Sequence, residues 1–456
     1  MNALSYAAML TSVPLGVMVF TVLPPRRAAL LVLIAAWMFL PVAEIPLPGF
    51  LDLSKQMAAC GATMLGVLAF DAKSLASLRL RWFDATILFY CCWPGVCAVA
   101  NGFGLWDGVS ATIEYMCTWG IPYFVGRVYF ADESGQTELL KGLFIAGLLY
   151  VPLCLIEMRI SPQLHSIFYG YHPSAFDQTF RLGGWRPVVF MQHGLAVALW
   201  MCVCSLAGFW LWKSKQLVPV AGMRYLPLLA LWATTLFTRS MGALALTSFI
   251  TLTLVSSELL RTRILLILLL LIAPAWVTVR SAGLFDGAVI GELAESLTGD
   301  PERRNSFDVR LDQENAVRDL ALSSPVFGHG RWGLGLDQRW LLEFRNHGAP
   351  QLAALVLLLQ QPLIAMCIKF RPGKGGDWDS PGIVLAAIPT LFMLDNLLNG
   401  MENPVFPFIC GATTHYWALK GQASDSTASE DNLESQGGWI DPRPALQRRL
   451  HRGHAI

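Results

Sequence analysis

Charged residues are scarce in this chain of 456 residues. Asp, Glu, Lys and Arg make up 14% of it, whereas soluble globular domains carry about 25%. Apolar residues make up 54%, and they recur in runs long enough to cross a membrane as helices. The composition therefore excludes a soluble globular domain. The net charge of +1, without a basic patch interleaved with aromatics, gives no support for nucleic-acid binding.

Motifs for nucleotide-driven chemistry and for metal binding are also missing. No Walker A, GxGxxG or GxSxG motif stands in a strand–helix context, and no histidine pair has HxxxH or HExxH spacing. The ten cysteines fall within apolar runs without zinc-site spacing, so they indicate small buried side chains rather than disulfides. We expect neither a metal nor another cofactor.

The hydropathy pattern predicts an all-α fold, a polytopic transmembrane helix bundle of about 12–13 spans. The candidate spans are 4–23, 28–42, 55–70, 83–100, 109–126, 140–157, 194–212, 223–238, 241–256, 264–279, 349–368, 381–396 and 404–419. Basic residues concentrate in every second connection, which the positive-inside rule assigns to the cytoplasm. The bundle covers 1–420, and the polar stretch 421–456 is expected to be a disordered cytoplasmic tail.

Two connections on the predicted external side, 158–193 and 280–348, are too long to be turns. Loops of this length usually carry function or structure of their own. Within the second loop, Leu311, Val317, Leu320 and Ala321 have the spacing of an amphipathic helix. The sequence therefore predicts a large helical external loop over the mouth of the bundle.

Lysine is absent from both external loops, while arginine is frequent there. Guanidinium is planar and binds two oxygens at once, which suits phosphate and diphosphate. Salt bridges with neighbouring acids are the alternative, as in the i,i+4 series Arg310, Glu314 and Arg318. Arg186 and Arg239 have few acidic neighbours in sequence and lie at helix edges, so we predict that they bind an anion.

Histidine supplies the candidate base. His347 and Arg345 stand together just before a long apolar run, and a neutral imidazole can accept a proton from a hydroxyl. We predict that His347 is catalytic and that Arg345 joins Arg186 and Arg239 in binding diphosphate. Further candidates for the site are His193, Arg310, His329 and Arg331.

The segment from about 180 to 370 resembles the O-antigen ligase and O-antigen polymerase superfamily of bacterial envelope glycosyltransferases. Four stretches carry the resemblance, in the family's order: RPVVFMQHG (186–194), TRSMGALAL (238–246), RLDQENAVRDLALSSPVFGHGRWGLG (310–335) and NHG (346–348). The last opens a helix where the family usually has His-Asn.

The resemblance implies a GT-C-like bundle in the bacterial cytoplasmic (inner) membrane, with its active site facing the periplasm. It also implies an inverting, metal-independent enzyme that needs no nucleotide sugar. Such enzymes move a glycan from an undecaprenyl-diphosphate carrier to the hydroxyl of a glycan or lipid-linked acceptor, as polymerase or ligase. In this chain the arginines would hold the diphosphate, His347 would deprotonate the acceptor, and membrane lipid would surround the helices.

Two other functions fit the same residues. A transporter or flippase of anionic lipid-linked sugars would bind phosphate through the same arginines and would use intramembrane acids such as Glu114 and Asp395. A membrane scaffold would use the external loop as a docking surface. Transfer of sugar to a new acceptor separates the enzyme from both alternatives.

Overall fold

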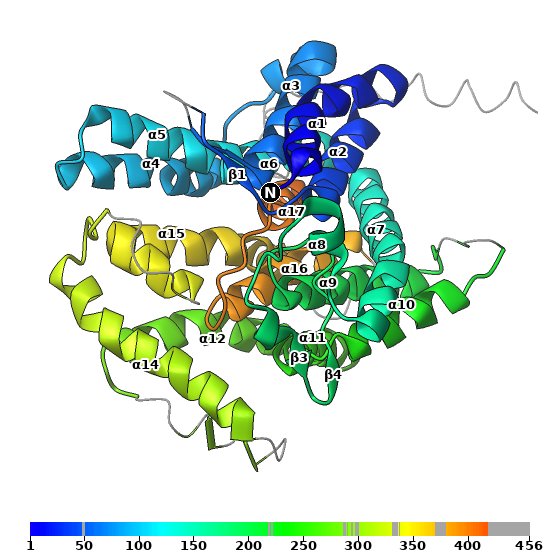
Figure 1. The fold of residues 1–456 in the computed structure, drawn as a ribbon. Coiled ribbons are helices and arrows are strands. Elements are labelled where there is room, and N and C mark those ends of the chain that lie inside the picture. The colour runs from blue at the N-terminus through cyan, green and yellow to red at the C-terminus, as the bar shows by residue number, and fades with distance from the viewer. Residues whose placement is uncertain are drawn as a thin grey trace, which may run out of the picture. The chain divides into compact units, whose positions relative to one another are not determined.

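Helices form nearly all of the regular structure of this protein (Figure 1). The computed structural model describes residues 1–47, 51–217, 219, 222–285, 289, 291–292, 295–296, 301–330, 336, 338–369 and 380–417, without the side chains of 301–303 and 305–307. Arg331 and the predicted disordered tail, 421–456, therefore lie outside the described residues. The chain divides into two units, Met1–Thr414 and His415–Ile456, and every element below belongs to the first.

The first half of the chain runs through helices joined mainly by short connections. Its helices are α1 (Ala3–Val22), α2 (Pro25–Phe39), α3 (Lys55–Ala76), η1 (Trp82–Asp84), α4 (Ala85–Ala100), α5 (Leu105–Tyr115), η2 (Met116–Gly120), α6 (Ile121–Phe130), α7 (Glu133–Ile160), α8 (Leu164–Tyr169) and η3 (Phe176–Thr179). Two antiparallel two-stranded hairpins follow α2 and η3: β1 (Glu44–Ile45) with β2 (Leu53–Ser54), and β3 (Phe180–Arg181) with β4 (Gly184–Trp185).

The second half continues with longer helices. They are α9 (Gly194–Lys213), α10 (Leu226–Phe237), α11 (Met241–Leu259), α12 (Ile264–Ser281), α14 (Pro301–Ser323), α15 (Arg339–Lys369), α16 (Pro381–Asp395) and α17 (Val405–Ala412). α9 and α16 lie in the interior of the bundle: every residue of α16 is buried, and α16 packs against α7, α9, α11, α15 and α17.

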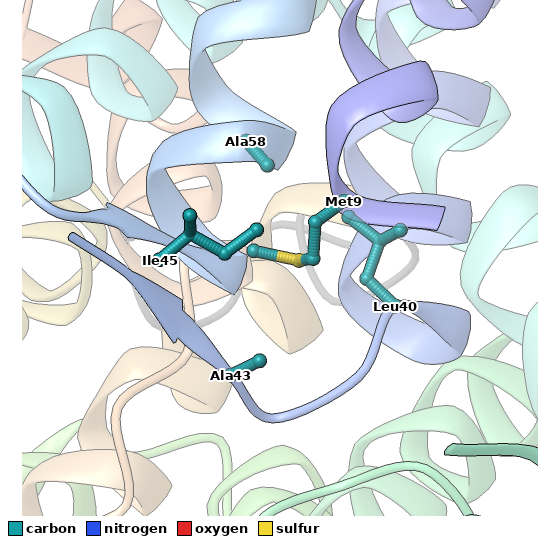
Figure 2. Packing of buried hydrophobic residues seen from close by; sticks show 5 residues of the cluster. All are labelled: Met9, Leu40, Ala43, Ile45 and Ala58. Carbon is teal, nitrogen blue, oxygen red and sulfur yellow. The ribbon is translucent and has the colours of Figure 1, made fainter. Parts of the chain in front are cut away.

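Eight helices in the described part of the chain are long and apolar enough to cross a membrane. They begin at residues 3, 55, 82, 133, 194, 241, 264 and 339, and α10 and α16 are shorter apolar helices. The predicted all-α membrane class is thus confirmed in its coarse form. One apolar cluster of Met9, Leu40, Ala43, Ile45 and Ala58 joins α1, β1 and α3 (Figure 2).

Connections that the charge pattern assigns to the same side of the membrane contact one another. On the predicted cytoplasmic side the contacts are Arg26 with Asp132, Arg127 with Asp84, Lys213 Nζ with Glu258 at 2.6 Å, and Arg263 Nη1 with the Cys367 carbonyl at 3.0 Å. On the predicted external side they include Asn2 Nδ2 with the Phe168 carbonyl at 2.9 Å, and Val42 N with His165 Nε2 at 3.2 Å. The two sets of connections therefore meet at two separate ends of the bundle.

Helix boundaries differ from the prediction at several places, and the start of α15 is the one that matters for the site. α15 begins at Arg339, ahead of the predicted span 349–368, because residues 339–347 form a further helical stretch before a break at Gly348. α14 contains the predicted amphipathic helix and buries Leu311 and Ala321, but Leu320 is 48% exposed.

Candidate functional site

α15 is broken at Gly348, one residue after the candidate base. Gly348 has φ +78° and ψ −179°, a conformation that favours glycine. Pro350 follows two residues later, and proline has no N–H to donate to the carbonyl of residue 346. The Gly-x-Pro sequence therefore ends the helical hydrogen bonding here and leaves backbone groups of the turn open to other partners.

The loop 325–330 binds these open groups. His329 N donates to the Arg345 carbonyl at 2.9 Å, and Gly330 N donates to the Asn346 carbonyl at 2.8 Å. In the other direction, Ala349 N donates to the Pro325 carbonyl at 2.7 Å. Two stretches that carried the resemblance, PVFGHG and NHG, are thus hydrogen-bonded to each other.

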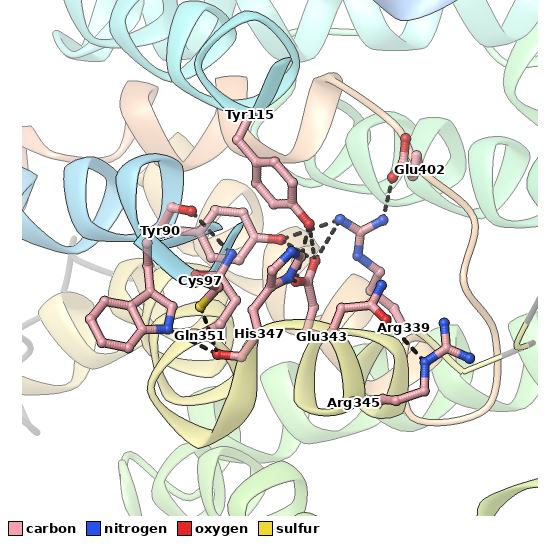
Figure 3. A network of polar contacts seen from close by, with 11 residues as sticks. Tyr90, Cys97, Tyr115, Arg339, Glu343, Arg345, His347, Gln351 and Glu402 are labelled. Carbon is pink, nitrogen blue, oxygen red and sulfur yellow. Dashed lines mark hydrogen bonds and ion pairs between the residues drawn. The ribbon is translucent and has the colours of Figure 1, made fainter. Parts of the chain in front are cut away.

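The imidazole of His347 is held by a carboxylate one turn earlier on the same helix (Figure 3). Nδ1 lies 3.0 Å from Glu343 Oε2, and the ring stands edge-on to Tyr115 at a centroid distance of 5.6 Å. Because a carboxylate only accepts, Nδ1 carries the proton and Nε2 is the acceptor nitrogen of the neutral ring. Within the described residues, no hydrogen bond to Nε2 is formed.

Glu343 is the centre of a buried polar network. Its carboxylate is 1% exposed and accepts from Tyr90 Oη at 2.8 Å and from Tyr115 Oη at 3.2 Å. Arg339 Nη2 lies 2.6 Å from Glu343 Oε1, and the same guanidinium pairs with Glu402. Arg339, Glu343 and His347 follow at i,i+4 spacing, so their side chains share one face of α15.

A second group of candidates gathers around the start of α9. Arg186 Nη2 donates to the Arg239 carbonyl at 3.0 Å, which joins two residues predicted to act together. Arg239 has φ +57°, and its guanidinium donates to the carbonyls of Arg181 and Leu182 in the β3–β4 hairpin. The hairpin therefore fixes the direction of the Arg239 side chain.

His193 is the N-cap of α9, where its Nδ1 accepts from Leu195 N at 3.0 Å. The pKa of His193 is lowered to about 4, chiefly by burial and additionally by the guanidinium groups of Arg186, Arg310 and Arg181. These cations thus act on a neutral imidazole at the positive end of a helix. Several cations at a helix N-terminus make a favourable place for an anion.

Contacts of Gln192 and Gln338 connect the residues around His347 with the residues around the start of α9. Gln192 Nε2 donates to the Glu402 carbonyl at 3.1 Å, while the Glu402 side chain pairs with Arg339. Gln338 Nε2 also donates to the Arg310 carbonyl at 2.7 Å. Among the described residues, however, no contact joins His347 directly to Arg186 or Arg239, so the two groups are neighbouring parts of one region.

The remaining candidates are placed less centrally. Arg345 is 5% exposed, and its Nε donates to Asn346 Oδ1 at 3.0 Å. His329 Nε2 lies 2.7 Å from the Leu320 carbonyl, at the end of α14.

Three partners of His347 and Glu343 were not predicted from the sequence: Arg339, Tyr90 and Tyr115. Glu343 is paired with Arg339 and His347. The i,i+4 series Arg339, Glu343, His347 is the signal that was present in the sequence. Nothing comparable marks the tyrosines, which approach from α4 and α5.

All ten cysteines are free thiols: eight are buried, whereas Cys117 is half-buried and Cys92 is exposed. Within the described residues, no three His, Cys, Asp or Glu side chains gather as metal ligands. No known protein family, curated protein or solved structure matches this chain.

Proposed function

We propose that this protein is a membrane glycosyltransferase that moves a glycan from a polyprenyl-diphosphate carrier to an acceptor hydroxyl. In this proposal the chain is a GT-C-like bundle of about 12–13 spans in the bacterial inner membrane, with the loops 158–193 and 280–348 on its periplasmic side. It acts as a polysaccharide polymerase or as an O-antigen-type ligase, by inversion and without a metal.

The Glu343–His347 pair supports this proposal most directly. The carboxylate fixes the imidazole with Nε2 as the acceptor nitrogen, which is the arrangement that a general base requires. Nε2 would take the proton of the acceptor hydroxyl while the hydroxyl oxygen forms the new bond to the anomeric carbon. The negative charge of Glu343 would stabilise the imidazolium that results.

The cations around His193 support the second half of the reaction. As the glycosidic bond to the carrier breaks, its electron pair passes to the diphosphate, which leaves with an additional negative charge. Arg186, Arg239 and Arg310 would stabilise this charge, since guanidinium groups bind phosphate oxygens strongly. Polyprenyl diphosphate and the elongated glycan are then the two products, and the proton is released from the imidazole to water.

A reconstituted transfer assay tests the proposal. Purified protein in lipid nanodiscs would receive an undecaprenyl-diphosphate-linked oligosaccharide and a soluble oligosaccharide acceptor, and the joined product would be measured by mass spectrometry. We expect transfer by the unaltered protein, and a loss of at least about 100-fold in His347→Ala, as for removal of a general base.

The matched control is His172→Ala, which removes another imidazole of the external side that hydrogen-bonds the Ser174 carbonyl at 2.6 Å. This variant should retain transfer. Movement of the lipid-linked sugar across liposome membranes, without transfer to the acceptor, would contradict the proposal and favour a flippase.

A further inference from the structure

The segment 186–193 carries two candidate residues at its ends but contains no helix or strand. Its turn is closed by Met191 N, which donates to the Val188 carbonyl at 3.0 Å. Val189 has φ +52°. A β-branched residue rarely adopts this left-handed conformation, so the turn needs support from the surrounding structure.

Glu157 of α7 supplies part of this support. Its side chain is fully buried, and Oε2 accepts from Val188 N and from Val189 N, each at 2.7 Å. Its other oxygen accepts from Leu164 N at 2.9 Å. One carboxylate thus fills the anion-binding concavity that two successive N–H groups form, so this concavity is not available to a phosphate.

Lys55, the first residue of α3, supports the next residue of the turn. It is 5% exposed, and Nζ donates to the Phe190 carbonyl at 2.6 Å while lying 5.2 Å from the centre of the Trp37 ring. Within the described residues, no salt bridge reaches Lys55 or Glu157. Two buried ionisable side chains from two different helices therefore bind the backbone of one turn rather than each other.

This arrangement is costly, because burying an ionisable group without an oppositely charged partner is unfavourable. The cost is explained if the position of the turn matters, since Arg186 and His193 flank the turn in the chain. We infer that Glu157 and Lys55 are positioning residues, which hold the 188–190 turn so that Arg186 and His193 face a common anion. The inference rests on the proposed function, in which that anion is the carrier's diphosphate.

Binding of undecaprenyl diphosphate without sugar, measured on purified protein in nanodiscs, tests the inference. Glu157→Gln keeps the size of the side chain but loses the charge, and we expect its Kd to rise at least tenfold. Lys55→Met, from a different helix, should have the same effect. Since Glu157 acts partly through Arg186, the increases in Kd caused by Glu157→Gln and by Arg186→Gln should combine to less than their product in the double variant.

Glu258→Gln is the control, because it makes the same Glu-to-Gln change at a partly exposed residue on the predicted cytoplasmic side, where Glu258 pairs with Lys213 Nζ at 2.6 Å. Its Kd should stay within twofold of the unaltered protein. An unchanged Kd in Glu157→Gln, or effects of Glu157→Gln and Arg186→Gln that multiply in the double variant, would overturn the inference.

Hydrogen exchange distinguishes failure of the positioning role from failure of the proposed function. If the unaltered protein does not bind the diphosphate, the proposed function fails. The positioning role is still decided by the amides of 186–193, which should exchange at least tenfold faster in Glu157→Gln and Lys55→Met than in Glu258→Gln. Equal exchange in all three variants would refute it.

Discussion

Glu343 and His347 lie one helical turn apart on α15, with Oε2 of the carboxylate 3.0 Å from Nδ1 of the imidazole. The carboxylate is also bound by Arg339, Tyr90 and Tyr115, so it cannot rotate away from the ring without breaking several contacts. A base oriented in this way depends on its partner, and that dependence can be measured.

Replacing Glu343 by Gln should lower the transfer rate by about 100-fold or more, because the amide can bind the imidazole in the wrong tautomer and carries no charge to stabilise the imidazolium. The loss should appear in kcat, with little change in the KM for the lipid-linked donor. Initial rates at varied donor concentration provide the measurement.

The same substitution leaves Arg339 with Glu402 as its ion-pair partner. Thermal unfolding of the Glu343→Gln protein is therefore needed beside the kinetics, to show that the variant remains folded at the assay temperature. A folded variant with unaltered kcat would remove the carboxylate from the mechanism.

Gly348→Ala should displace the 325–330 loop from the break in α15. A Cβ at residue 348 would lie 2.1 Å from the Val326 carbonyl oxygen, and the positive φ disfavours alanine in any case. We expect a loss of about 1–3 kcal/mol in stability, the usual cost of such a backbone conformation, and at least a tenfold loss of transfer. Thermal unfolding and initial rates measure the two effects.

Gly61→Ala in α3 is the matched control, since nothing lies within 4 Å of a Cβ added there. It should leave both quantities nearly unchanged. Equal behaviour of the two variants would show that the contact between the loop and the break has no effect on the site.

The stability of the protein should depend on pH through His193. Its pKa is lowered to about 4 from the usual 6.5, first by burial and then by the nearby guanidinium groups of Arg186, Arg310 and Arg181. Between these two pH values the unfolded chain binds a proton that the folded chain does not. The free energy of unfolding should therefore rise with pH from 4 to 6.5, by up to about 3 kcal/mol, and stay level above that range.

His165 adds to the same slope, because burial lowers its pKa to about 4 as well. His193→Asn isolates one contribution: asparagine is a good N-cap for α9 but does not titrate. Chemical unfolding at a series of pH values should show a smaller slope in this variant by about one proton. The same slope in both proteins would contradict the lowered pKa of His193.

Sequence periodicity was sufficient to predict the helices but not the polar network. Apolar runs predicted most of the membrane helices, and charge alternation grouped the connections that contact one another at each end of the bundle. The start of α15 was missed because residues 339–347 are polar, and hydropathy detects only apolar helices. Their i,i+4 spacing was the available signal for Arg339 and Glu343.

Contacts between distant parts of the chain had no local signal. Tyr90 and Glu343 are separated by 253 positions and Tyr115 and Glu343 by 228, so only the folded bundle brings them together. Nothing in the sequence marked Glu157 or Lys55. Both side chains bind backbone groups, so neither has a complementary side chain whose spacing could be recognised.

The break in α15 relates the position of the His347 imidazole to the thickness of the membrane. The helical stretch 349–369 extends about 30 Å at 1.5 Å per residue, which is about the depth of a hydrocarbon core. If Lys369 lies in one headgroup region, His347 lies near the opposite hydrocarbon boundary. Under the proposed function, lipids with longer or shorter acyl chains should shift Nε2 of His347 relative to the headgroups and so change how acceptors reach it.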